Sequence, residues 1–272
     1  MATKYALCIK KDTELDKVFH KDSEFINVYM VDREICEDPK NDYLQIIPYV
    51  VFYTVDTQNN KIKFLNYTRP SNNSEERLIN KVSVGLGGHI DHTDIEIPQE
   101  GKTINNNTLN EIITKAAIRE IKEEIGIDLK EEIEEGNMTS SNRYAFIIED
   151  GSEVDSVHVC NLLPIYVKPD YFNEFLSKLK LNEAEIEKAG TLALNLDDIV
   201  EDYDISTTCD NLIKELNSKY NMENWSLFSV AIIVKSVYHY FMSKITFEDI
   251  KQIAMQKIQK QATQEEARTR VH

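Results

Sequence analysis

The spacing of hydrophobic positions changes along this chain and divides it into an α/β part and a helical part. Residues 44–55 are β-branched and aromatic with few breaks, and polar residues 58–60 separate them from a second apolar stretch at 61–67. That arrangement predicts a β-hairpin. Further apolar runs predict short strands at 82–84, 143–149 and 157–167, and a helix at 171–181.

One long helix is predicted between the strands at 82–84 and 143–149. Thr108 and Glu111 have the Thr-x-x-Glu spacing of a capping box, and apolar residues follow with the helical period as far as Ile125. Gly126 is expected to end the helix. Residues 94–107, immediately before it, are mostly polar, so we expect a loop there.

The strand pattern ends near residue 200, and only helical periodicity follows. Helices are predicted at 207–220, 225–243 and 246–261. Their aromatic residues suit either a core or a dimer surface. We therefore expect three parts, namely an N-terminal segment (1–40), an α/β domain (41–200) and an all-helical C-terminal extension (201–272).

Composition narrows the possible partners. The chain has 272 residues with 47 acidic and 31 basic side chains, for a formal net charge of −16. Nucleic acid is therefore an unlikely partner, because its binding depends on basic side chains. No apolar run approaches the roughly 20 residues of a membrane helix. The four cysteines are widely spaced and form no Cys-x-x-Cys pair, which disfavours zinc knuckles and disulfides and favours the cytoplasm.

A cluster of carboxylates lies at the end of the long predicted helix. Glu120, Glu123 and Glu124 are three and four residues apart, so they share one face of the helix. Such a cluster costs stability through like-charge repulsion and through the negative end of the helix dipole. A hard divalent cation would turn this repulsion into ligation, and carboxylate oxygens favour Mg²⁺ or Mn²⁺. The expected chemistry is metal-assisted attack of water on a phosphoanhydride.

The segment from Glu111 to Ile127 resembles the signature of the Nudix hydrolases. That signature is Gly-x5-Glu-x7-Arg-Glu-U-x-Glu-Glu-x-Gly-U, where U is apolar, and every position from Glu111 onwards matches it. Asn105 stands where the signature glycine is expected. Gly88 is the nearest substitute, and this assignment implies 17 extra residues between Gly88 and Glu111. That insertion, roughly residues 91–107, is either a substrate-selecting loop or a plain surface excursion.

The resemblance implies a fold and a set of site residues. The implied fold is an α/β/α sandwich around a mixed sheet. Glu120, Glu123, Glu124 and the Gly88 carbonyl would bind the metal, and Arg119 would orient Glu120, so that the catalytic group is Arg119, Glu120 and Glu123. Glu111 would cap the helix or pair with Arg119. Substrate contacts are expected from Arg69, Arg77, Gly87 and His89. The general base is expected among Glu149, Asp150, Glu153, Asp155 and the glutamates of the signature.

The implied activity is cleavage of a pyrophosphate bond in a nucleoside diphosphate linked to another moiety. The alternative is a non-catalytic Nudix-like module that senses a nucleotide or binds a partner. Because many members of the family are dimers, a homodimer is also expected.

Overall fold

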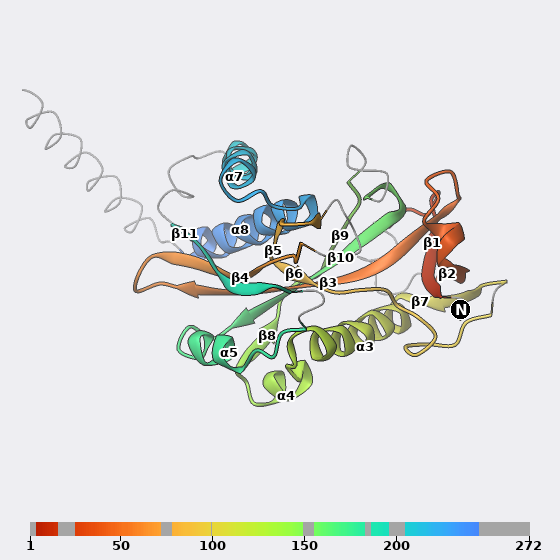
Figure 1. Cartoon of the computed structure of the whole chain (residues 1–272), viewed down its shortest axis with the longest axis horizontal. Helices are drawn as coiled ribbons and strands as arrows, with labels where there is room; N and C mark the ends of the chain where they lie inside the picture. The colour runs from red at the N-terminus through yellow and green to blue at the C-terminus, as the bar shows by residue number, and fades with distance from the viewer. Residues whose placement is uncertain are drawn as a thin grey trace, which may run out of the picture.

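The computed structural model describes residues 4–15, 25–71, 78–98, 100–148, 155–182, 186–195 and 205–244. Figure 1 shows a large sheet with helices on both faces. The strands are β1(Tyr5–Lys10), β2(Phe25–Asp32), β3(Tyr43–Asp56), β4(Lys61–Thr68), β5(Val82–Ser83), β6(Gly85–Leu86), β7(Lys102–Asn105), β8(Met138–Ser140), β9(Tyr144–Phe146), β10(His158–Val167) and β11(Lys188–Asn195). The helices are α2(Arg33–Cys36), α3(Asn106–Ile125), α4(Leu129–Glu134), α5(Phe172–Lys178), α7(Ile205–Tyr220) and α8(Asn224–Lys244), with a 3-10 turn η2(Asp155–Val157).

The sheet is built around β3, which is its longest strand. Twelve of the fourteen residues of β3 are buried, which is typical of a strand covered on both faces. It pairs in parallel with β10 and antiparallel with β1 and β4. The path β11-β4-β3-β1-β2-β7 carries most of the sheet, and β10 joins it beside β3. The sheet is therefore mixed.

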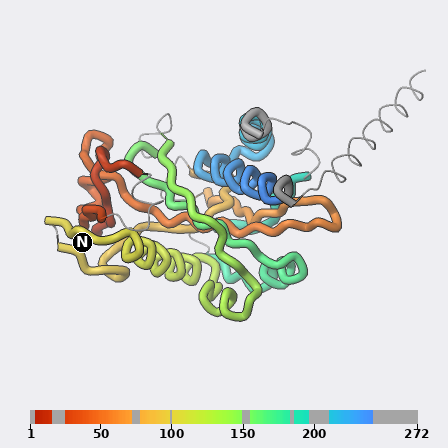
Figure 2. Tube along the Cα trace, turned by 180° about the vertical axis from the view of Figure 1, so that it is seen from behind, coloured from red at the N-terminus to blue at the C-terminus, as the bar shows by residue number. Residues whose placement is uncertain are grey.

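Alternate side chains of β3 point into two different cores. Val50 and Phe52 pack with α3, whereas Tyr49 and Val51 pack with buried residues of α8. Helices α3, α4 and α5 lie on one face of the sheet, and α7 and α8 lie on the other, as Figure 1 and the view from behind in Figure 2 both show. The predicted α/β class with C-terminal helices is confirmed, and α8 forms the second helical layer of the sandwich. The domain boundaries at 40 and 200 stay predictions.

The start of the long helix differs from the expected capping box. The helix begins at Asn106, and the Asn105 side chain caps it by accepting a hydrogen bond from the Thr108 amide at 2.8 Å. Thr108 therefore lies inside the first turn. The predicted end is confirmed, since Gly126 has φ of 71° and its amide donates to the Lys122 carbonyl at 3.1 Å.

Part of the expected loop at 94–107 is a strand. Residues 102–105 form β7, which pairs antiparallel with β2 at Phe25–Val28. Local composition did not indicate it, because the partner strand lies far away in the sequence and supplies the hydrogen bonds. The strand expected at 143–149 is limited to β9, while β10, α5, α7 and α8 agree with the prediction. The helix predicted at 246–261 lies outside the described residues.

None of the described helices combines the length and the apolar character needed to cross a bilayer.

Candidate functional site

A cavity of about 720 Å³ lies where the carboxyl-terminal part of α3 approaches the sheet. Glu120, Glu123 and Glu124 line one side of it, and Gly87, Gly88 and His89 lie beside them. A cavity of this size suits a ligand as large as a nucleotide. The residues singled out by the sequence as metal ligands therefore meet at one hollow.

Arg119 forms hydrogen bonds to several residues at this end of the cavity. Its guanidinium donates two hydrogen bonds to Asp94, at 3.1 and 2.8 Å, and its Nη2 also donates to the His89 carbonyl at 3.0 Å. Its Nη1 donates to Glu120 at 2.8 Å and to Glu123 at 3.2 Å. The hydrogen bond with Asp94 is the largest cause that raises the pKa of Arg119. The expectation that Arg119 orients Glu120 has direct geometric support.

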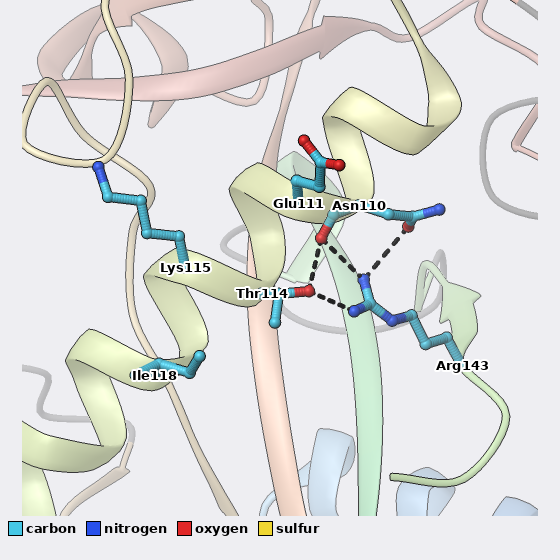
Figure 3. Close-up of a pocket in the computed structure, with 6 residues that line it drawn as sticks. All are labelled: Asn110, Glu111, Thr114, Lys115, Ile118 and Arg143. Carbon is cyan, nitrogen blue, oxygen red and sulfur yellow. Dashed lines mark hydrogen bonds between the residues drawn. The ribbon is translucent and has the colours of Figure 1, made fainter. Parts of the chain in front are cut away.

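The pairing of Arg119 with Glu111 is wrong. Glu111 is exposed and lies with Asn110, Thr114, Lys115, Ile118 and Arg143 along a second, open groove (Figure 3). The acid that pairs with Arg119 is Asp94, whose side chain is only 1% exposed. A buried carboxylate needs such a partner, whereas an exposed one does not.

The pairing of Asp94 with Arg119 also changes where the expected insertion lies in the sequence. Asp94 follows Gly88 with five residues between them, which is the spacing that the Nudix signature gives to its glycine and acid. Between Asp94 and Arg119 lie 24 residues in place of seven, so the 17 extra residues fall after the acid. Among the described residues of 91–107, only Asp91, His92 and Thr93 line the cavity. Most of the described part of the insertion is therefore a structural excursion that ends in β7.

Gly88 and Glu120 are in close contact. A Cβ atom on Gly88 would lie 2.6 to 2.8 Å from the carboxylate atoms of Glu120. The absence of a side chain at position 88 thus leaves room for that carboxylate beside the backbone. Burial raises the pKa of Glu120, although the adjacent Arg119 guanidinium opposes this shift. A buried carboxylate of this kind is a natural ligand for a cation.

The three glutamates differ in burial. Glu124 is buried, whereas the side chain of Glu123 is 59% exposed. In the described ranges, no three acidic, histidine or cysteine side chains converge closely enough to hold a metal ion. Arg119 Nη1 contacts both Glu120 and Glu123, so a cation would require Glu123 to exchange this hydrogen bond for a metal contact. Its exposure leaves room for that rotation, and the oxygen donors fit a hard cation.

The structure brings three of the four expected substrate residues to the cavity. Gly87 is essential for packing, because a Cβ there would lie 1.9 Å from the Pro48 carbonyl oxygen. His89 lies at the cavity, and burial, followed by the charge of Arg33, lowers its pKa to about 3, so its imidazole is neutral near pH 7. Arg69 lines the cavity as well. Arg77 lies outside the described residues.

Arg69 is compensated by acidic neighbours. Burial lowers its pKa, but electrostatic interactions, among them those with Glu223 and Glu124, outweigh this effect and raise the pKa overall. Its ring contact with Tyr67 places the guanidinium carbon 5.1 Å from the ring centre. The positive charge of Arg69 thus already interacts with groups of the protein.

Only one loop candidate for the general base can be placed. Asp155 is buried and lines the cavity, and Asn224 Nδ2 donates to its carboxylate at 3.4 Å. Glu149, Asp150 and Glu153 lie outside the described residues. Asp155 therefore lies at the cavity together with the signature glutamates Glu120, Glu123 and Glu124.

The C-terminal segment supplies a wall that the sequence did not indicate. Glu223, Asn224 and Trp225 line the cavity, and Tyr49 donates a hydrogen bond from its hydroxyl to the buried Glu223 carboxylate. Ser226 Oγ accepts a hydrogen bond from the Val84 amide at 2.9 Å. Each of these hydrogen bonds joins residues more than 140 positions apart in the sequence, so no local motif could predict it.

Comparisons with known proteins give a fold-level similarity only. No family model matches the chain, and no curated protein matches it. The structure is similar to that of Tm1382, a candidate Nudix hydrolase, at 16% identity over 85% of this chain and 98% of that one, with a TM-score of 0.42. It is also similar to a Nudix hydrolase from Alicyclobacillus acidocaldarius, at 12% identity over 70% and 90% of the two chains and a TM-score of 0.40. A Nudix-family hydrolase from Clostridium perfringens has 13% identity over 71% and 97%, with a TM-score of 0.36. At these identities and TM-scores the similarity carries no argument about activity.

Proposed function

We propose that this protein is a Nudix-type hydrolase that cleaves a pyrophosphate bond in a nucleoside diphosphate linked to another moiety. The observation that carries the proposal is the contact of the Glu120 carboxylate with Gly88 at a cavity that Glu123 and Glu124 also line. Arg119 holds Glu120 by a hydrogen bond of 2.8 Å. The resemblance to the signature assigns these same residues to the metal site.

We propose that Glu120, Glu123, Glu124 and the Gly88 carbonyl hold Mg²⁺ or Mn²⁺. The bound metal would neutralise phosphate oxygens and lower the pKa of an attacking water. Arg119 keeps the Glu120 carboxylate oriented, because it is itself held by the buried Asp94 through two hydrogen bonds. The residues of the chain thus supply the negative charge and its orientation.

The reaction needs a base as well. Water would form a new bond to phosphorus while the bridging P–O bond breaks, and a carboxylate would take the proton from the water. Asp155 and Glu123 are both at the cavity, so we propose one of them for this role. The variant Asp155→Asn distinguishes the two candidates. If Asp155 is the base, this variant should lose the acidic limb of the pH–rate profile and still bind the metal.

The direct test of the proposed function is hydrolysis in the presence of Mg²⁺. The protein would be incubated with sugar nucleotides, dinucleoside polyphosphates, a dinucleotide cofactor and modified nucleoside triphosphates. We expect Glu120→Gln to lower turnover at least about 100-fold, because a lost metal ligand removes several kcal/mol of charge stabilisation. Glu111→Gln is the matched control, since Glu111 lies in the other groove, and it should leave turnover unchanged.

Two other outcomes would change the proposal. Binding of nucleotides without turnover across the panel would favour a sensing or partner-binding module. Turnover that is insensitive to Glu120→Gln would place the reaction elsewhere. The homodimer and the cytoplasmic location stay predictions, and sedimentation of the purified protein tests the first of them.

A further inference from the structure

The cavity is rich in negative charge, which an anionic substrate must overcome. Six carboxylates line it, from Asp91, Glu120, Glu123, Glu124, Asp155 and Glu223. Three permanent cations line it as well, from Lys4, Arg33 and Arg69. A metal ion bound by the glutamates would make the electrostatic potential positive only at that end of the cavity. Any phosphate away from the metal has to find its counter-charge among the three cations.

Arg69 is the least available of these cations. It is held over the ring of Tyr67, with its guanidinium carbon 5.1 Å from the ring centre, and it lines the cavity together with the carboxylates of Glu124 and Glu223. Lys4, in contrast, is exposed and forms no ion pair with any described residue. Arg33 uses Nε and Nη2 for Glu37, at 3.1 and 2.8 Å, and its Nη1 has no partner within the described ranges. Two cations with free donors therefore remain at the wall formed by the N-terminal segment.

A backbone hydrogen bond joins the two residues that carry these cations. The Arg33 amide donates to the Lys4 carbonyl at 2.9 Å, at the ends of the paired strands β1 and β2. The Leu7 amide donates to the Ile90 carbonyl at 2.9 Å, which fixes β1 directly to the loop after Gly88. The Tyr5 and His92 rings also meet edge to face, with 4.8 Å between their centres.

The same loop connects this wall to the metal end of the cavity. The His89 carbonyl accepts a hydrogen bond from Arg119, which also holds Glu120. The loop after Gly88 thus connects the carboxylate end of the cavity to the wall that carries Lys4 and Arg33.

We propose that Lys4 and Arg33 form an anion subsite that binds a phosphate group of the substrate beyond the pyrophosphate bond that is cleaved. This inference rests on the proposed function and narrows its substrate class. The substrate would carry at least one phosphate more than a simple diphosphate linkage, either in a longer polyphosphate chain or on the second moiety. The N-terminal segment, which lies outside the segment that resembles the Nudix signature, would then select the substrate.

The test measures binding separately from hydrolysis. Calorimetry with Mg²⁺ would compare inorganic tripolyphosphate with inorganic pyrophosphate on the wild type, Lys4→Gln, Arg33→Gln and the control Lys11→Gln. Lys11 lies in the same segment but does not line the cavity, and its ammonium donates to the Pro39 carbonyl. We expect each subsite variant to weaken tripolyphosphate binding about 5- to 20-fold, as for one lost charge-assisted contact, and to change pyrophosphate binding less than about twofold.

Two results would overturn the subsite. One is an equal loss for both ligands, which would indicate a general field effect, and the other is no loss for either. Lys4 forms no ion pair within the described part of the chain, so its variant should melt at the wild-type temperature and a binding loss cannot be assigned to misfolding. A Lys4-dependent preference without turnover of any substrate would refute the proposed function and leave the subsite standing.

A second comparison identifies the source of the extra phosphate. The ratio of kcat/KM between the wild type and Lys4→Gln would be measured for a nucleoside triphosphate and for a nucleoside diphosphate joined to a phosphorylated sugar. A ratio of about 5 to 20 for the triphosphate alone supports a polyphosphate chain, and the same ratio for the sugar substrate alone supports a phosphorylated second moiety. A ratio near one for both refutes the subsite.

Discussion

The pairing of Arg119 with Asp94 can be tested by Asp94→Asn, which keeps the shape of the side chain and removes its charge. Asp94 is 1% exposed and accepts two hydrogen bonds from Arg119. Breaking a buried ion pair typically costs about 3–5 kcal/mol. Arg119 keeps Glu120 and Glu123 and is 24% exposed, so we expect a smaller loss of about 2–3 kcal/mol in the free energy of unfolding.

The assay is thermal unfolding followed by circular dichroism, without metal and at neutral pH. For a chain of this size, 1 kcal/mol corresponds to about 2 °C in Tm, so Asp94→Asn should melt about 4–6 °C below the wild type. Glu111→Gln is the control and should melt within about 1 °C of the wild type, because Glu111 is exposed. A larger loss for Glu111→Gln than for Asp94→Asn would refute the assignment of Asp94 and would restore the pairing that the signature alone suggests.

Three further predictions concern the glycines, the histidine and the C-terminal wall. Gly88→Ala should fold, because its Cβ displaces only the end of the Glu120 side chain, but it should lose most of the stabilisation by Mg²⁺ in a melting assay. Gly87→Ala should destabilise the whole fold, because its Cβ would meet the backbone of Pro48. His89 has a folded pKa of about 3, below its unfolded value, so its contribution to stability is present above about pH 6.5 and is lost as the pH falls. At pH 5 the free energy of unfolding should be lower by about 2 kcal/mol. His89→Gln should remove this pH dependence, which urea titrations at several pH values would measure. Tyr49→Phe should cost about 1–3 kcal/mol, because the buried Glu223 carboxylate loses a hydrogen-bond donor; an unchanged midpoint in denaturant would contradict this.

Several features of this protein follow from local sequence. The hairpin of β3 and β4, the strand β10 and the helix α3 with its end at Gly126 all agree with the periodicity of apolar residues. The same is true of the clustering of Glu120, Glu123 and Glu124, because positions three and four apart on a helix share a face in any context. These properties depend on residues within a few turns of one another, so the sequence alone determined them.

Tertiary structure decided the partners of these elements. Asp94 rather than Glu111 pairs with Arg119, because folding buries Asp94 and leaves Glu111 at the surface. The walls of the cavity come from Lys4 and Arg33 at one end of the chain and from Glu223 to Trp225 near the other. Long-range strand pairing and packing bring these residues together. The sequence therefore determined the carboxylates of the candidate site, and the fold decided which charges surround them.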